Sequence, residues 1–230
     1  MEHAKVGLAS ATSVGTRRPK PYSCGVAELK FFWDYMTEHV DRIRRVVELL
    51  DRLRVTYALI GGHAVSFHAR PRLTVDIDFL VAMQRISAIE KALPDSGFVV
   101  RRRGDVVSAW DQGMNPDSDE PVLDFVPAEL SDSQAEALRS AIEVRYQNIT
   151  LRMVSRPALV ALKFLSATSL SRGHLDKMQD VVDIGHTIEK SFTDADLAEA
   201  RRIVSASNPP AANELSRLID DLRHGRKITI

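Results

Sequence analysis

The chain has 230 residues, enough for one large domain or two small ones with a substantial core. Hydrophobic residues make up 44% and charged residues 27%, which excludes the disordered and fibrous classes. Lysine plus arginine and aspartate plus glutamate number 31 each, so the formal net charge is zero. This balance argues against bulk electrostatic attraction to nucleic acid or membranes, and it leaves room for a local basic groove.

Cysteine usage and hydropathy exclude further classes of protein. Cys24 is the only cysteine, which excludes an intrachain disulfide framework and a cysteine-rich metal site. No apolar run reaches the length of a membrane span, and the N-terminus lacks the core of a signal peptide. We therefore expect a cytoplasmic protein without a membrane partner.

The N-terminal part divides into a tail and a helix. Residues 1–25 are rich in Ala, Ser, Thr, Gly and Pro without periodicity, which predicts a flexible tail. The following segment has apolar residues at intervals of three and four, the pattern of an amphipathic helix. Its apolar stripe consists of Leu29, Phe32, Met36, Val40, Ile43, Val47 and Leu50.

A strand, a glycine pair, a helix and a second strand come next. "VTYALI" (55–60) is rich in β-branched and aromatic residues and predicts a buried strand that ends at Gly61 and Gly62. Residues 63–69 predict a short helix that stops before Pro71. "TVDIDFLVA" (74–82) predicts the second strand.

The middle of the chain continues with alternating elements. A helix is predicted at 84–93, two strands at 98–103 and 106–110, a loop at 111–121 and a strand at 122–128. Ser131 and Gln134 form a capping-box pattern that opens a helix to about residue 141. Short strands are predicted at 144–146 and 149–154.

Only helices are predicted after Ser155, at 157–169, 175–190, 194–206 and 212–223. Strands followed by a run of helices predict an α+β fold. We expect an α+β core at residues 26–154 and a helical C-terminal subdomain at residues 155–230.

Three acids stand inside apolar strand patterns. In a strand, Asp76 and Asp78 would face the same side about 7 Å apart, and Asp124 in "VLDFV" is a lone acid in another strand. Carboxylates that share a face repel one another unless they are protonated or bridged by a cation. Oxygen ligands at this spacing suit Mg²⁺, and three acids on neighbouring strands would suit a two-metal site for phosphoryl chemistry.

The alternative is a solvent-facing strand edge, on which acids need no special role. The setting favours a site, because Gly61 and Gly62 let the backbone approach a ligand closely. The helix that follows would offer free N–H groups to an anion. The glycines therefore predict the phosphate-binding side of a site, and the acids predict the metal-binding side of the same site.

The stretch "GGHAVSFHARPRLTVDIDFLV" (61–81) resembles the signature of the nucleotidyltransferase superfamily, a Gly-Gly or Gly-Ser turn followed by D-x-D. In its closer form, Gly-Gly-x-Ala followed by Arg-x-Thr-x-Asp-x-Asp, it resembles abortive-infection type nucleotidyltransferases that act as toxins in toxin–antitoxin pairs. Asp124 matches the third carboxylate of that family. The resemblance implies a polymerase-beta-like mixed sheet core with helices and a helical C-terminal part.

A second segment, "RPALVALKFLSATSLSRGHLDKMQDVVDI" (156–184), resembles the helical segment of the same family. That segment has a lysine and then the pattern Arg…Lys-x-x-Asp-x-x-Asp. Here the pattern falls on Lys163, Arg172, Lys177, Asp180 and Asp183, with a stretched spacing after Arg172. The whole resemblance covers roughly residues 40–190.

The resemblance implies roles for the acids. Asp76 and Asp78 would hold one or two Mg²⁺ ions against the triphosphate of a nucleoside triphosphate. Asp124 would share a metal and help deprotonate the acceptor hydroxyl. The hydroxyl oxygen would then attack the α-phosphate, and pyrophosphate would leave.

The resemblance also implies a nucleotide-binding set. Gly61, Gly62 and the amide of His63 would cradle the β- and γ-phosphates, and the motif adds Arg72 and Thr74. Lys163, in an apolar helical stretch, would be the cation for the triphosphate.

Several of these residues have plainer alternatives. Lys163 could extend to solvent, and Arg72 could pair with the nearby acids. Asp180 and Asp183 are most simply an intrahelical ion network with Lys177. Arg101–Arg103 favour a solvated strand edge over a nucleic-acid contact, and Trp110 favours core packing over base stacking.

Together these patterns predict a Mg²⁺-dependent nucleotidyltransferase that moves a nucleoside monophosphate to an acceptor, with tRNA or a protein hydroxyl favoured. The resemblance implies a toxin with a cognate antitoxin. One alternative is an antibiotic-modifying nucleotidyltransferase. Another is a non-catalytic module of the same fold that binds a nucleotide or a partner. Three retained acids favour an enzyme, because a degenerate copy has no physical reason to keep costly charges.

Overall fold

The structure is a computed structural model that describes the backbone of residues 26–189 and 191–228, and side chains from residue 37 onward within these ranges. The predicted tail at residues 1–25 lies outside the described residues, as do the side chains of Leu29, Phe32 and Met36. Among the described residues, those from Glu38 onward form a compact unit of their own, which contains the sheet and every predicted site residue.

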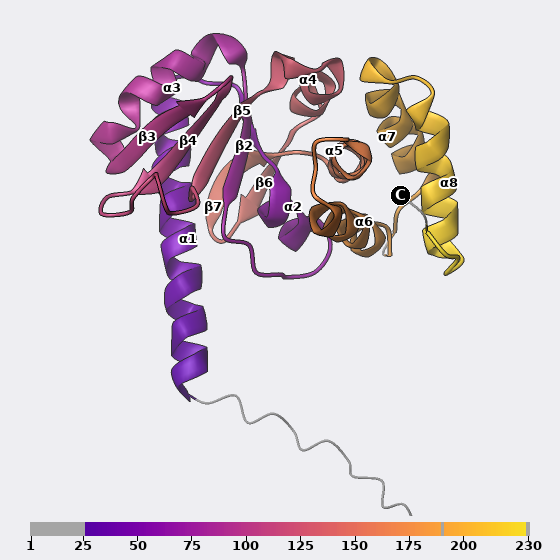
Figure 1. Ribbon diagram of the computed structural model, residues 1–230, viewed down its shortest axis with the longest axis horizontal. Coiled ribbons are helices and arrows are strands. Elements are labelled where there is room, and N and C mark those ends of the chain that lie inside the picture. Colours follow the sequence, from indigo (N-terminus) through magenta and orange to yellow (C-terminus); the bar gives the residue numbers. More distant parts are fainter. Residues whose placement is uncertain (1–25, 190, 229–230) are drawn as a thin grey trace, which may run out of the picture. The chain divides into compact units, whose positions relative to one another are not determined.

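A seven-stranded mixed sheet forms the centre of this unit, in the order β3-β4-β5-β2-β1-β7-β6 (Figure 1). The pairs β2–β5 and β1–β7 are parallel, and the remaining neighbours are antiparallel. The strands are β1 (Tyr57–Leu59), β2 (Ile77–Val81), β3 (Phe98–Arg103), β4 (Val106–Asp111), β5 (Leu123–Pro127), β6 (Ile142–Tyr146) and β7 (Ile149–Met153).

The helices surround and extend this sheet. They are α1 (Val26–Arg52), α2 (Gly61–His68), α3 (Ile86–Ala92), α4 (Asp132–Arg139), α5 (Arg156–Thr168), α6 (His174–Ile188), α7 (Asp194–Ser207) and α8 (Ala211–Arg223). Short 3-10 turns stand at Met83–Arg85, Pro94–Ser96 and Ala128–Leu130. No helix among the described residues is both long and apolar enough to cross a membrane.

The core follows from alternation along the central strands. Ile77 and Phe79 of β2 are fully buried, and Phe79 stacks on Phe125 of the neighbouring strand with ring centroids 5.6 Å apart. Asp78, between them, points to the opposite face, because successive side chains of a strand alternate. From α1, Ile43, Val47 and Leu50 are buried in the same core and Val40 packs against it, which confirms the described part of the predicted stripe.

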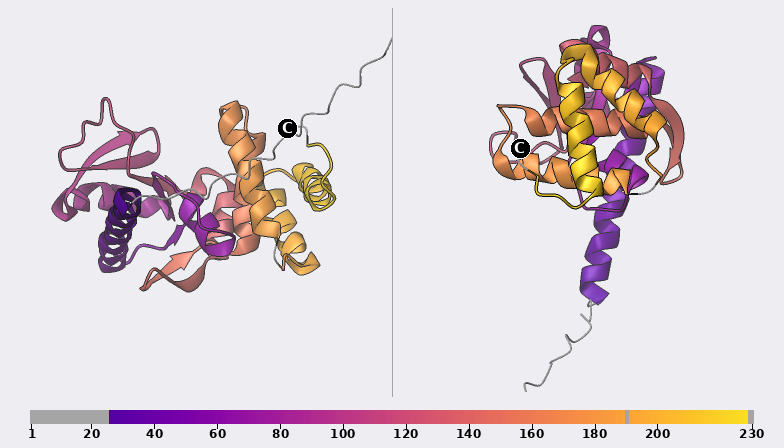
Figure 2. Two further views of the ribbon diagram at one scale, coloured as in Figure 1. Left: turned by 90° about the horizontal axis from the view of Figure 1, so that it is seen from below. Right: turned by 90° about the vertical axis from the view of Figure 1, so that its right-hand side faces the viewer.

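The C-terminal helices stack beyond one end of the sheet, with α5 and α6 next to the strands and α7 and α8 farther out (Figures 1 and 2). The last strand ends at Met153, close to the predicted boundary at residue 154. Buried side chains of the sheet and of these helices nevertheless belong to one continuous core. The division into a catalytic core and a helical subdomain stays a prediction.

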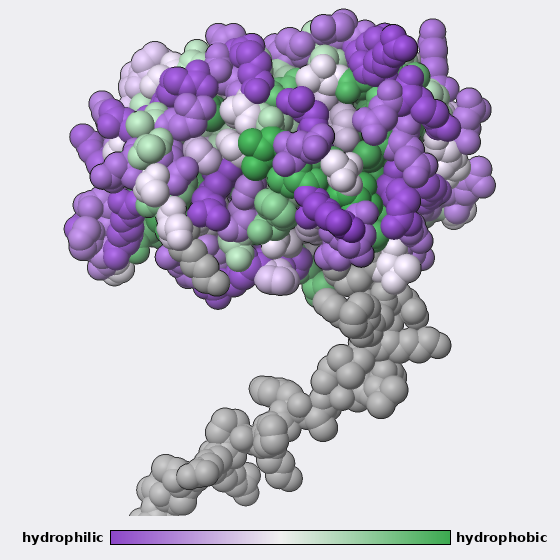
Figure 3. Space-filling model, turned by 180° about the vertical axis from the view of Figure 1, so that it is seen from behind, coloured by the Kyte–Doolittle hydropathy of each residue, from purple (hydrophilic) through white to green (hydrophobic). Residues whose placement is uncertain are grey.

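The surface is mostly polar, and on the face seen in Figure 3 apolar side chains gather toward the centre. The predicted elements are confirmed with small shifts at their ends, and the predicted α+β class is confirmed with them. One shift affects the site. The strand predicted at 74–82 begins only at Ile77, so Thr74 and Asp76 lie in the loop before β2 and not in the strand.

Candidate active site

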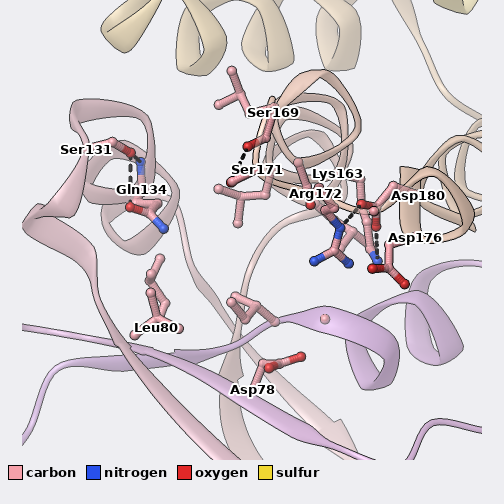
Figure 4. Close-up of a pocket in the computed structure, with 18 residues that line it drawn as sticks. Asp78, Leu80, Ser131, Gln134, Lys163, Ser169, Ser171, Arg172, Asp176 and Asp180 are labelled. Carbon is pink, nitrogen blue, oxygen red and sulfur yellow. Dashed lines mark hydrogen bonds and ion pairs between the residues drawn. The ribbon is translucent and has the colours of Figure 1, made fainter. Parts of the chain in front are cut away.

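A cleft of about 610 Å³ lies over the face of the central strands that carries Asp78. Asp78 and Leu80 of β2 and Gly61 of α2 form its floor, and α4 and α5 contribute its walls. The segment that joins α5 to α6 closes one side with Arg172 (Figure 4). The volume falls within the range of about 300–1,000 Å³ that is typical of small-molecule sites.

Asp78 and Asp124 stand side by side at the centre of the sheet. They are direct partners in the register of parallel strands β2 and β5. Ser108, opposite Asp124 on β4, donates its hydroxyl to Asp124 Oδ1 at 2.5 Å. The predicted proximity of these two acids is therefore present in the sheet, and Ser108 holds one carboxylate in place.

The glycine pair packs directly against the acidic strand and the loop before it. Gly61 has φ +64°, and a Cβ built on it would lie 2.0 Å from Asp78 Oδ2. A Cβ on Gly62 would lie 2.4 Å from Thr74 Oγ1. Only glycine fits at these two positions, because any side chain would displace Asp78 or Thr74. Both glycines open α2, whose first N–H groups have no acceptor within the helix.

Asp76 is exposed in the loop before β2, two residues from Asp78 along the chain. Thr74, which is buried, donates its hydroxyl to Asp76 Oδ1 at 2.8 Å. Thr74 thus orients an acid, a role that differs from the nucleotide contact predicted for it.

The acids repel one another electrostatically. Burial, followed by the charges of Asp76 and Asp124, raises the pKa of Asp78 to about 7, while Lys163 and Arg172 act in the opposite direction. Burial also raises the pKa of Asp124; the hydrogen bond from Ser108 opposes this, and the charge of Asp76 adds to it. Asp76 and Asp124 therefore make the ionised form of Asp78 more costly, and Asp76 has the same effect on Asp124.

The donor set suits a divalent cation such as Mg²⁺, since it consists of carboxylate oxygens whose repulsion a cation would relieve. Within the part of the chain that the structure describes, no three His, Cys, Asp or Glu side chains converge into a ready-made metal site. Asp76, Asp78 and Asp124 fit the ion by charge and chemistry, and their convergence on it stays a prediction.

Lys163 lies on the cleft wall and also belongs to an ion network. Its Nζ lies 2.8 Å from Asp180 Oδ1 and 2.8 Å from Asp183 Oδ2, which links α5 to α6. Arg172 Nε donates to Asp180 Oδ2 at 2.8 Å. The interpretation of Asp180 and Asp183 as an intrahelical network with Lys177 is wrong, because their cations come from other segments.

Arg72 joins this network from the loop before β2. Its guanidinium lies 3.3 Å from Asp183 Oδ2 and also contacts the glycine turn, 3.0 Å from a Cβ built on Gly62. The plainer alternative for Arg72, an ion pair with an acid, is present. The partner is Asp183 of α6 and not one of the three predicted catalytic acids.

His63 turns its side chain away from the cleft into a buried aromatic group. Its Nδ1 lies 3.1 Å from the hydroxyl of Tyr146, and its ring centroid lies 5.5 Å from that of His39. Burial, followed by the charge of His39, lowers the pKa of His63 to about 4, so its imidazole is neutral at pH 7. Only its backbone amide, in the first turn of α2, suits the predicted phosphate contact.

The comparisons with known proteins agree with this geometry. The family model of the nucleotidyl transferase AbiEii toxin, of type IV toxin–antitoxin systems, matches residues 48–223. The chain belongs to this family. The matched range contains every predicted site residue and both walls of the cleft, and it makes the chain a member of a nucleotidyltransferase enzyme family.

Two solved structures are similar to this chain, and the one with the higher TM-score shows a shared fold. The solution structure of the antibiotic-resistance factor ANT(2″)-Ia matches with a TM-score of 0.52 and 14% identity, over 83% of this chain and 99% of that chain. A nucleotidyltransferase-like protein from Paracoccidioides brasiliensis matches with a TM-score of 0.46 and 17% identity, over 74% and 88% of the two chains. The first likeness shows that this AbiEii-family chain has the nucleotidyltransferase fold. Among curated proteins, no match is found.

Two features outside the cleft also match the plainer predictions made for them. Trp110 is fully buried and donates its indole N–H to the carbonyl of Asp119 at 2.8 Å, so it packs the core and anchors the 111–121 loop. Arg101 and Arg102 pair with Asp117 and Glu90, as expected of a solvated strand edge. Arg103 lies over the ring of Trp110, 5.1 Å from its centroid.

Sequence reasoning missed one wall of the cleft. Ser131 and Gln134 line it from α4, and Ser169 and Ser171 line it from the segment after α5. In the sequence, the first pair has the pattern of a helix cap, and the second pair has the composition of a turn. No local signal distinguishes such residues from ordinary caps and turns.

Proposed function

We propose that this AbiEii-family chain transfers a nucleoside monophosphate from a nucleoside triphosphate to an acceptor hydroxyl in a Mg²⁺-dependent reaction. The favoured acceptors are tRNA and a protein side chain, and the transfer would act as a toxin that a cognate antitoxin opposes. The family and its fold support the reaction class. The acceptor and the metal are part of the proposal.

One observation carries the proposal. Asp78 lies on the floor of a cleft, under the glycine turn, with Asp124 beside it in register on β5, while Lys163 and Arg172 lie on the wall of the cleft. A single space is therefore bordered by three kinds of group. Acids could bind a metal, backbone N–H groups could bind phosphates, and cations could bind a polyanion. This combination is what phosphoryl transfer requires, since its catalysis is mostly positioning and charge stabilisation.

Different residues of the chain would have different roles in the transfer reaction. The N–H groups at the start of α2 and the cations Lys163 and Arg172 would hold the triphosphate with its α-phosphate near Asp78. Asp124 would take the proton of the acceptor hydroxyl as the new oxygen–phosphorus bond forms. The bond from the α-phosphorus to the bridging oxygen would break, and pyrophosphate would leave. A bound divalent cation would supply charge neutralisation at the phosphate oxygens.

The hydrogen bonds around the acids support these roles. Ser108 holds Oδ1 of Asp124, which leaves the other oxygen of that carboxylate for the acceptor proton or a cation. Thr74 holds Oδ1 of Asp76 in the same way. The raised pKa of Asp124 suits a general base better than an ordinary surface carboxylate does.

The test is label transfer from α-³²P nucleoside triphosphates in the presence of Mg²⁺. Total RNA, a protein lysate and an aminoglycoside serve as acceptors in separate reactions. We expect label on RNA or protein with the wild type, and none with Asp124→Asn or Asp78→Asn.

A matched control is Asp117→Asn, which removes an exposed carboxylate that pairs with Arg101 far from the cleft. It should transfer label at the wild-type rate. Label on the aminoglycoside alone would replace the proposed acceptor with an antibiotic. Nucleotide binding without transfer to any acceptor would contradict the proposed function and favour a binding module.

A further inference from the structure

The cleft has two chemically different ends (Figure 4). At one end stand Lys163, Arg172 and Asp180, close to Asp78 on the floor. At the other end stand Ser131 and Gln134, on the first turn of α4. The first end offers charge to a phosphate chain, whereas the second end is neutral and offers one amide.

Between the two ends the lining is apolar. Leu80 and Val126 project from neighbouring strands β2 and β5, where they are direct register partners. From α5, Leu162 lines this region and is half-buried, as Val126 is, whereas Leu159 and Leu80 are almost fully buried beneath them. A flat apolar ring can lie on such a surface, because burial of aliphatic and aromatic carbon is favourable and needs no specific partner.

The side chain of Gln134 is held in one orientation by the helix cap. Ser131 accepts a hydrogen bond from the Gln134 backbone N–H at 3.1 Å and donates its hydroxyl to Gln134 Oε1 at 3.1 Å. This arrangement turns Oε1 toward Ser131 and leaves the amide NH₂ group facing the cleft (Figure 4). Gln134 is half-buried, and among the described residues no side chain accepts a hydrogen bond from its NH₂ group.

We propose that Gln134 is a specificity-determining residue that contacts the base of the bound nucleotide. The base lies on the apolar lining, its phosphates extend toward Lys163 and Arg172, and the NH₂ group of Gln134 donates to the base edge. A donor at this place favours a keto oxygen, as in guanine and uracil, over an exocyclic amine, as in adenine and cytosine. Ser131 is the positioning residue that aims the amide. This inference rests on the proposed function, because it takes a nucleotide as the ligand.

The experiment measures binding without turnover. Calorimetry with the α,β-methylene analogues of ATP, CTP, GTP and UTP, each with Mg²⁺, gives four dissociation constants per protein. Wild type should bind the GTP and UTP analogues more tightly than the ATP and CTP analogues. Gln134→Glu replaces the donor with an acceptor of the same shape, so the preference should shift toward ATP and CTP by tenfold or more. Gln134→Leu should reduce the preference without reversing it.

The control is Thr193→Ala. This substitution removes the N-cap of α7, where Thr193 and Asp196 form hydrogen bonds outside the cleft. This variant should keep the wild-type order of the four analogues even though it also loses a helix cap. If Gln134→Glu changes all four affinities by the same factor, the inference is overturned.

Label transfer by the same proteins separates the two proposals. Transfer with an unchanged order of nucleotides in both Gln134 variants overturns the base contact and leaves the proposed reaction standing. A shifted order of binding without any transfer supports the base contact and contradicts the reaction. Absence of nucleotide binding by the wild type contradicts both.

Discussion

Two groups of carboxylates lie within this protein, and their surroundings differ. Asp180 and Asp183 of α6 are 1% and 0% exposed, and their oxygens contact Lys163, Arg172 and Arg72. Asp78 lines the cleft, Asp124 lies beside it on β5 and Asp76 lies in the loop before β2. In the described part of the chain none of these three acids has an ion pair with lysine or arginine.

The difference in ion pairing indicates which acids stabilise the fold and which acids are available to bind a ligand. A buried charge is tolerated when cations and hydrogen bonds surround it, so the α6 acids are satisfied within the fold. Burial, together with repulsion between the cleft acids, raises the pKa of Asp78 to about 7. Such a group gains a partner only when a cation enters the cleft. We therefore assign stability to the first group and function to the second.

The largest expected effect is on transfer. Asp124→Asn removes the proposed general base and one ligand of the cation, so the rate of label transfer should fall by about 10³-fold or more. The free energy of unfolding should not fall, because the carboxylate has no ion pair to lose and burial disfavours its charge. Rates and urea unfolding curves measured on the same preparation check both parts. A rate of label transfer within tenfold of the wild-type rate would contradict the functional role given to the acids of the cleft.

The reverse pattern is expected for α6. Asp183→Asn leaves Lys163 and Arg72 without their shared carboxylate, so the free energy of unfolding should fall by about 3 kcal/mol. Urea unfolding measures this loss. Asp176→Asn, on the exposed side of the same helix, is the matched control for stability and should change it by less than about 0.5 kcal/mol. A loss below about 1 kcal/mol for Asp183→Asn would show that the network contributes little.

Asp78→Asn should stabilise the protein in EDTA at pH 8. The pKa of Asp78 is about 7 in the folded chain, well above that of an unfolded aspartate, so the folded state binds the extra proton between about pH 4 and pH 7. The contribution of this group to stability therefore falls as the pH rises through that window. The asparagine variant escapes this loss and should be more stable by about 2 kcal/mol at pH 8.

The same unfolding series at pH 4 is the internal reference, since the folded forms of both proteins are neutral at this position there. Equal stabilities at pH 8 would show that the carboxylate is not strained by its neighbours.

The smallest predicted effect concerns Ser108. Ser108→Ala removes the hydroxyl that donates to Asp124, a hydrogen bond that opposes the rise in the pKa of Asp124. The pKa of Asp124 should rise further, so the acidic limb of the pH–rate profile should move to higher pH and transfer on that limb should slow. Ser108→Thr keeps a hydroxyl and should restore the wild-type limb. An unmoved limb in the alanine variant would exclude Asp124 as the titrating base.

Much of the fold could be predicted from the sequence, because apolar periodicity and turn residues determine the helices and strands locally. The strand at 74–82 was predicted too long because Thr74 and Val75 are β-branched. Thr74 instead bonds the carboxylate of Asp76, a local contact that competes with strand pairing. The strand order could not be predicted, since it depends on pairings between distant segments such as β2 with β5.

The floor of the site and Lys163 on its wall could be predicted, whereas the other residues of the wall could not. Asp78 and Asp124 stand out because a charge in an apolar strand is costly, and Gly61 stands out because it precedes the acidic strand. The cationic partners of Asp183 come from 20 and 111 positions away along the chain, so only the folded structure brings them together. Gln134 gives the signal of a helix cap, and its place in the cleft depends on how α4 packs over β2.

The most direct test of the central claim is the cation dependence of nucleotide binding. Calorimetry of a non-hydrolysable nucleoside triphosphate would be run with Mg²⁺ and with EDTA, on wild type and on the Asp78→Asn, Asp124→Asn double variant. We predict that wild type binds about 100-fold more tightly with Mg²⁺ and that the double variant loses this dependence. Equal affinity of the wild type with Mg²⁺ and with EDTA would contradict the claim that the unpaired acids of the cleft serve to bind a cation together with the nucleotide.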